Sequence, residues 1–133
     1  MPTTVTVVPV ARFSLLLVSL LVTVACGGSS GGELSTEAAD GRAIALRQGC
    51  ASCHGADGSG GVGPSFVGLY GSHVTLTDGS TVVADDEYLR RSITDPGAER
   101  VEGYAVNMPF NADVTEEDIE AVLAYIRELG STP

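Results

Sequence analysis

The sequence predicts a small, mainly α-helical domain that carries a short β-hairpin and follows an N-terminal leader. Three observations predict this fold class. A strongly amphipathic segment with clear start and stop signals lies near the C-terminus, and two β-branched runs flank an Asp-Gly pair in the middle of the chain. Large apolar side chains are few, whereas the chain has 17 glycines. Because so small a domain can bury only a modest core, an additional apolar body inside the fold would help to stabilise it.

The first helix is expected within the segment STEAADGRAIALRQG. Ser35 or Thr36 can cap its N-terminus, Glu37 adds an acid to the first turn, and the helix should end near Gly49. The residues expected on its buried face are Ala39, Ala43, Leu46 and Ile44. Residues 55–71, which are rich in glycine, should form neither a helix nor a strand but a loop that wraps around another part of the domain or a bound group.

A hairpin and a second helix are expected next. The short runs on either side of Asp78-Gly79, in VTLTDGSTVV, are typical of a β-hairpin. A helix over residues 86–94 should begin at Asp85 or Asp86, and Pro96 should stop it.

The last helix has the clearest signals in the chain. Thr115 and Asp118 form a capping box, and Gly130 marks the C-terminal stop. The apolar residues that follow the helical period, and should therefore be buried, are Ile119, Val122, Leu123, Ile126 and Leu129.

The N-terminal segment is typical of an export signal. An unbroken run of apolar and small residues, 13–25, follows Arg12 and is shorter than the roughly 20 apolar residues of a spanning helix. Cys26 and the sequence GGSSGGE come directly after it, an arrangement that resembles a bacterial lipoprotein signal with a lipidated cysteine. Plain cleavage near Ala25 and an uncut membrane anchor are the alternatives. The expected organisation is a signal peptide over residues 1–25, a Gly/Ser tether over 26–34 and one domain over 35–131.

The charge of the chain limits its partners. It has 17 Asp and Glu against seven Arg and no Lys, so its formal net charge is −10. Nucleic-acid binding depends on cations that neutralise phosphates, so this balance argues against it. A basic partner surface, or a membrane reached through a lipid, suits the chain better.

The stretch GCASCHGADG admits three chemistries. A zinc site would need His73 as a fourth ligand beside Cys50, Cys53 and His54, and ligation by two adjacent residues is awkward. A redox dithiol belongs at a helix start beside a strand, whereas this pair closes a helix and enters a glycine loop. A haem reading uses every residue: two thiols at this spacing can add to the two vinyl groups of one porphyrin, and the next histidine can reach the iron.

A haem iron held by His54 needs a sixth ligand. Apart from Met1, the only methionine is Met108, in YAVNMPF, on a loop where Pro109 prevents a helix. His73 is the alternative ligand, and an open position is the third option. We expect Met108 to bind the iron.

The stretch from about residue 41 to 130 resembles a class I cytochrome c domain. In detail it is similar to the haem domain fused to subunit II of some bacterial haem-copper oxidases. The similarity rests on five segments: GCASCHGADGSGGVGPSFVGLYGS, VTLTDGSTV, YLRRSITDPGAERVEGY, MPF and TEEDIEAVLAYIREL. The resemblance implies a small fold of three to four helices around one covalent haem c, with the hairpin as an insertion.

The resemblance also implies roles for individual residues. Cys50 and Cys53 would form the thioether bonds, and His54 and Met108 would be the axial ligands. The carbonyl of Pro64 would accept a hydrogen bond from His54, and the first and last helices would cross closely at Gly41. Independently of the resemblance, a cation or hydroxyl near the haem propionates would offset their charge; the candidates are Arg100, Tyr70 and Tyr104, and surface placement is the alternative for each.

The chain departs from the oxidase subunit because it has no residues for a copper domain outside the haem motif. We therefore expect a free-standing haem domain, an electron carrier and not an enzyme, which is monomeric and lipid-anchored through Cys26 in the bacterial cell envelope. Its expected partners are membrane redox complexes: a quinol-oxidising complex and a terminal oxidase or reductase. The alternatives are a ligand-binding or peroxidatic haem protein with a labile Met108, and the cytochrome subunit of a dehydrogenase complex.

Overall fold

The computed structural model describes residues 1–2 and 33–130. The export signal, Cys26 and most of the predicted tether therefore lie outside the described residues. The elements of the domain, in chain order, are α1 (Thr36–Arg47), α2 (Ala51–His54), β1 (His73–Thr75), β2 (Thr81–Val83), α3 (Asp86–Thr94) and α4 (Glu116–Gly130). Four helices and one two-stranded sheet confirm the predicted fold class. Within the described part of the chain, no helix has the length and apolarity that crossing a membrane requires.

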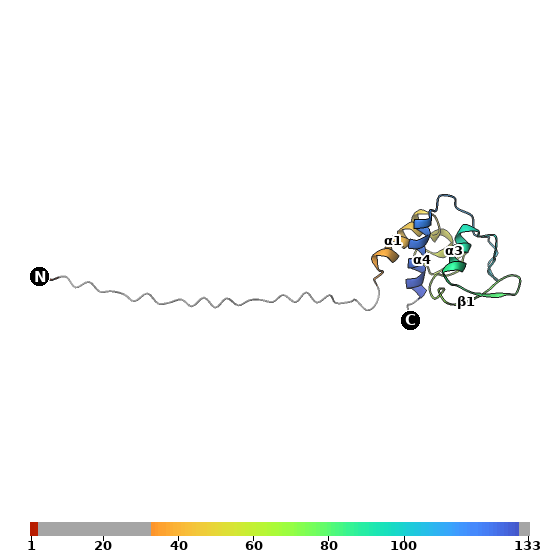
Figure 1. Ribbon diagram of the computed structural model, residues 1–133, viewed down its shortest axis with the longest axis horizontal. Helices are drawn as coiled ribbons and strands as arrows, with labels where there is room; N and C mark the ends of the chain where they lie inside the picture. The colour runs from red at the N-terminus through yellow and green to blue at the C-terminus, as the bar shows by residue number, and fades with distance from the viewer. Residues whose placement is uncertain (3–32, 131–133) are drawn as a thin grey trace. The chain divides into compact units, whose positions relative to one another are not determined.

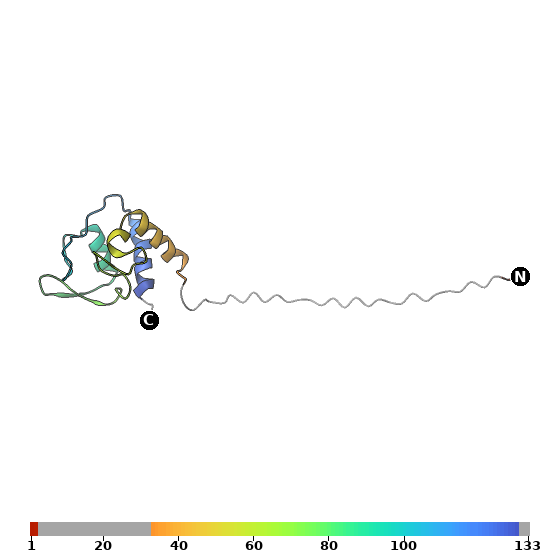
Figure 2. The ribbon, with the colours of Figure 1, turned by 180° about the vertical axis from the view of Figure 1, so that it is seen from behind.

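The central packing of the domain is the crossing of α1 over α4, which is visible from both sides (Figures 1 and 2). Gly41 lies at the crossing, where a Cβ atom would lie 1.9 Å from the backbone oxygen of Ala121 and 3.0 Å from the Cβ of Tyr125. Contacts this short leave no space for any side chain. The close crossing that the resemblance implied at Gly41 is thus present.

The buried face of α1 differs from the predicted one. Ala39, Ala43 and Leu46 are exposed, and Ile44 is half-buried. The buried residues are Ala38, Gly41 and Ala45. Because backbones can approach this closely only over very small side chains, the glycine and its neighbours one turn away face α4. The predicted face had been chosen by apolarity without regard to size.

The ends of α1 and α4 follow local signals. Ser35 caps α1, since its hydroxyl accepts a hydrogen bond from the amide of Ala38 at 3.2 Å. In the predicted capping box of α4, the Asp118 amide donates to the Thr115 hydroxyl at 3.2 Å, and Asp118 Oδ2 accepts from the Thr115 amide at 3.1 Å. The predicted stripe of α4 faces the core: four of its residues are buried and Leu129 is half-buried.

The hairpin is confirmed as an antiparallel pair of strands. Val74 of β1 pairs with Val82 of β2, and the turn is closed by Asp78, whose carboxylate accepts from the Ser80 amide at 2.9 Å. Leu76, directly after β1, forms an isolated antiparallel bridge with Val101. The hairpin is therefore joined to the segment that leads toward Met108.

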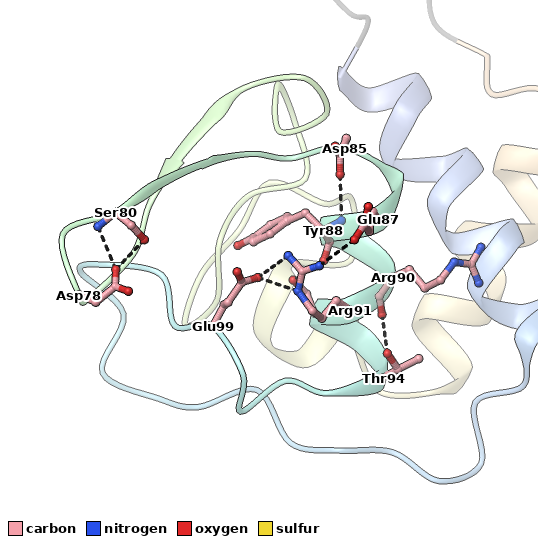
Figure 3. A network of polar contacts seen from close by, with 10 residues as sticks. Asp78, Ser80, Asp85, Glu87, Tyr88, Arg90, Arg91, Thr94 and Glu99 are labelled. Carbon is pink, nitrogen blue, oxygen red and sulfur yellow. Dashed lines mark hydrogen bonds and ion pairs between the residues drawn. The ribbon is translucent and has the colours of Figure 1, made fainter.

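Helix α3 spans the residues that the sequence predicted, 86–94. Asp85 caps it, because its carboxylate accepts from the Tyr88 amide at 2.9 Å. Arg91 holds the segment after the helix, since its Nε and Nη2 donate to Glu99 Oε2 at 3.0 and 2.9 Å (Figure 3). At the other side of α3, Arg127 of α4 donates to Asp86 at 2.7 Å. Ion pairs thus fix α3 both to α4 and to the loop that follows it.

Candidate functional site

A cavity of about 710 Å³ lies inside the domain. It is bounded by α2, the loop after it, β1, α3, residues 99–111 and the inner face of α4, from which Val122 and Ile126 reach it. Its volume is in the range of ligand and cofactor pockets, and much of its lining is apolar. Five residues that the sequence singled out, from three separate segments, line it together: Cys50, Cys53, His54, Pro64 and Met108.

The two cysteines lie at the single helical turn of α2: Cys50 is its N-cap and Cys53 lies within it. Gly49, at a φ of 83°, separates this turn from α1, and Gly55, at a φ of 85°, ends it. The end of the first helix near Gly49 agrees with the prediction, whereas the separate helical turn of α2 is a feature that the pattern did not predict. Cys50 and Cys53 are three residues apart, which places them on the same side of a helical turn. Both thiols are free and half-buried, and burial raises the pKa of Cys50.

The imidazole of His54 is held on several sides. Its Nδ1 lies 2.7 Å from the carbonyl oxygen of Pro64, which can only accept, so Nδ1 donates and the lone pair remains on Nε2. The Phe66 ring stacks on it, with the ring centroids 4.5 Å apart and the planes 18° apart. A Cβ on Gly63 would lie 3.0 Å from its Cε1. Burial lowers the pKa of His54, which favours the neutral ring that a metal ligand requires.

Met108 lies on the loop between α3 and α4 and is half-buried at the cavity. The loop is attached at both ends. Before it, the Glu102 amide donates to the Thr75 carbonyl at 2.9 Å. After it, the Asn111 side chain donates at 3.2 Å to the carbonyl of Gln48, which is the C-cap of α1. These two attachments keep Met108 beside the cavity.

Of the other residues expected at the site, some line the cavity and one does not. Arg100 and Tyr104 line the cavity, as does His73 at the start of β1. Tyr70 is not among the residues that line the cavity: the guanidinium of Arg127 lies over its ring, 5.9 Å from the centroid, and its place near the propionates stays a prediction. Helix α4, which was not considered for this position, offers this cation to the ring.

Sequence reasoning missed two features of the site. Phe66 was not considered, although an aromatic residue two positions after the proline that accepts from His54 could have been noticed. Tyr88 and Glu99 also line the cavity, and Glu99 is the carboxylate that Arg91 holds. Nothing local in the sequence indicates that these two residues meet.

The donor set fits a covalently attached haem. Two thiols lie at one helical turn, the adjacent imidazole keeps a free Nε2, and a thioether lines the same cavity. The apolar walls suit a large macrocycle, and Arg100 provides a cation for acidic substituents. A haem bound in this cavity would be the additional apolar body that the small core requires.

Comparisons with known proteins agree with this geometry. The family model described as Cytochrome c matches residues 38–130. The chain is also similar to Cytochrome c2 iso-1 of Magnetospirillum molischianum, with 32% identity over 88 residues that cover 59% of this chain and 87% of the relative. The chain therefore belongs to the cytochrome c family, and it is a domain that binds haem c covalently at the C-x-x-C-H motif of residues 50–54.

Proposed function

We propose that the protein is a monohaem electron carrier in which His54 and Met108 are the axial ligands. Cys50 and Cys53 attach the haem through thioether bonds. The observation that carries the proposal is the hydrogen bond from His54 Nδ1 to Pro64, which leaves Nε2 free toward a cavity that Met108 also lines. The bound haem supplies a one-electron couple at its iron. No side chain of the protein needs to gain or lose a bond during transfer.

The protein's own residues set the properties of that couple. The Pro64 carbonyl fixes the tautomer and orientation of His54 and raises its basicity as a ligand. A thioether from Met108 raises the reduction potential relative to a second histidine. The apolar walls exclude water, so the surroundings rearrange little when the charge changes. Arg100 and Tyr104, which line the cavity, would offset the negative charge of the propionates.

The setting of the carrier follows from its leader and its charge. We expect Cys26 to be lipidated after removal of residues 1–25, which would hold the domain at the outer face of the cytoplasmic membrane or in the periplasm. The Gly/Ser tether would keep it near membrane complexes at high effective concentration. In this setting the domain passes electrons from a quinol-oxidising complex to a terminal oxidase or reductase. The net charge of −10 suits a basic docking surface on these partners.

The ligand assignment is tested by an optical spectrum of the holoprotein, made in cells that attach haem c. We expect covalent low-spin haem with the weak far-red band of methionine ligation. Met108→Ala should abolish this band and allow rapid CO binding to the ferrous protein, whereas Val83→Ala, exposed on β2 and outside the cavity lining, should change neither. A Met108→Ala protein with the wild-type spectrum would refute the assignment, and loss of low-spin character in His73→Ala would assign the sixth position to His73.

The anchor and the partners need separate measurements. Cys26→Ser should release the domain from membrane fractions, and an unchanged distribution would refute lipid anchoring. Oxidation of the reduced protein by membranes from the same cells should depend on ionic strength if a basic surface receives it. A rate that does not change with salt would argue against that surface.

A further inference from the structure

An aromatic contact series connects the helix crossing to His54. The Phe66 ring stacks on the imidazole at 4.5 Å between centroids, and its other neighbour is the Tyr125 ring of α4, which it meets edge to face at 6.2 Å and 87°. Phe66 and Tyr125 are both buried, with 7% and 3% of their surfaces exposed. Neither ring can therefore move without displacing the core around it.

The far end of this series lies at the close crossing of α1 and α4. Tyr125 packs at the crossing of α1 and α4, where a Cβ on Gly41 would lie 3.0 Å from the Tyr125 Cβ. Gly58 closes the other side, because a Cβ there would lie 3.2 Å from the Tyr125 hydroxyl and 3.3 Å from the Phe66 Cβ. The position of the Tyr125 ring is thus determined by the way the two terminal helices pack.

The stack and the hydrogen bond constrain His54 differently. The Pro64 carbonyl holds one edge of the imidazole but allows it to tilt about the axis through that contact. A flat ring 18° from parallel on the face of the imidazole opposes this tilt. Phe66 therefore determines the plane of the imidazole, whereas Pro64 determines its tautomer.

We propose that Phe66 is a positioning residue for the axial ligand, and that Tyr125 acts through it to make the imidazole plane depend on the packing of α1 against α4. This inference rests on the proposed ligand role of His54. The plane of an axial imidazole affects the electronic asymmetry at the iron, so orientation is a means by which surrounding residues tune the metal. Tyr125 is not among the residues that line the cavity, and the contact that links its ring to the imidazole runs through Phe66.

The test compares ferric holoproteins by electron paramagnetic resonance and by the pattern of haem-methyl proton shifts, both of which depend on the ligand plane. Phe66→Leu removes the flat face and keeps an apolar side chain. Tyr125→Leu removes the second ring, and Tyr125→Phe keeps the ring without its hydroxyl. Ile119→Val is the matched control, because Ile119 is buried in α4 but lies outside the cavity lining.

We expect Phe66→Leu to shift the g values and the methyl pattern and to change the reduction potential. Tyr125→Leu should shift them in the same direction by less, and should add nothing in a Phe66→Leu background, which is the coupling that a positioning series requires. Tyr125→Phe and Ile119→Val should keep the wild-type g values even where thermal stability falls.

Wild-type g values in a folded Phe66→Leu protein would overturn the proposal, as would an equal shift in Ile119→Val. Additive shifts in the double variant would overturn the role of Tyr125. Absence of a low-spin ferric signal in the wild type would instead refute the proposed axial ligation, so the two failures are distinguishable.

Discussion

Asn111 holds the loop that carries Met108, and its loss should make this ligand exchangeable. Its side-chain amide donates to the Gln48 carbonyl at 3.2 Å and to the Gln48 side-chain oxygen at 3.4 Å. In the part of the chain that the structure describes, residues 103–110 make no backbone hydrogen bond to other backbone groups. Asn111 is therefore the attachment nearest to Met108, and Asn111→Ala is the perturbation that tests it.

The size of the effect follows from these contacts. A hydrogen bond between neutral groups contributes about 0.5–1.5 kcal/mol net, and the second of the two contacts is long, so the pair should contribute about 1.4 kcal/mol. That energy corresponds to a roughly tenfold larger population of open loop. CO binding to the ferrous holoprotein should then be about tenfold faster in Asn111→Ala, because CO binds when Met108 has left.

The assay is stopped-flow CO binding, with the far-red band as a second readout. Asp113→Ala is the control, because the hydrogen bonds that Gln48 and Asn111 form with residue 113 use its backbone oxygen and amide, which the substitution keeps. It should bind CO at the wild-type rate. If Asn111→Ala is folded and binds CO no faster than Asp113→Ala, then the attachment at Gln48 does not hold Met108 and this reasoning is wrong.

Two further predictions concern stability. Gly41→Ala should cost about 3 kcal/mol or more, since its Cβ would lie 1.9 Å from the Ala121 oxygen; thermal unfolding should move down by roughly 12–24 °C, and an unchanged midpoint would contradict the close crossing. Hydrogen bonds from Thr115 lower the pKa of Asp118, so its charge stabilises the fold above the ordinary pKa of about 3.9, and this contribution is lost as the pH falls through the lower folded value. Asp118→Asn should therefore unfold at a lower temperature than wild type at pH 7 and at the same temperature well below pH 3, whereas a difference that persists in acid would show that the charge is not responsible.

The elements of the fold could be predicted from the sequence where local signals define them. Asp85, Thr115 and Gly130 bound α3 and α4 because capping and chain termination act within one turn. The buried face of α1 could not be predicted in this way. Which side of a helix is buried depends on what it packs against, and here a close approach to α4 selected Ala38, Gly41 and Ala45 over the larger Leu46.

The sequence by itself indicated the attachment chemistry: C-x-x-C-H offers two thiols and a histidine within five consecutive residues, and the glycine loop and the lack of a well-placed fourth ligand argue against a redox dithiol and a zinc site. It also indicated Met108, since the chain offers no other methionine apart from Met1. Only the tertiary structure shows that the Tyr70 ring contacts the guanidinium of Arg127, and that the Phe66 ring contacts both His54 and Tyr125. The contacts of Tyr70 and Phe66 with α4 join residues far apart in the chain, so they exist only once α4 has packed against the loop after α2, and that packing is not a local property of any segment.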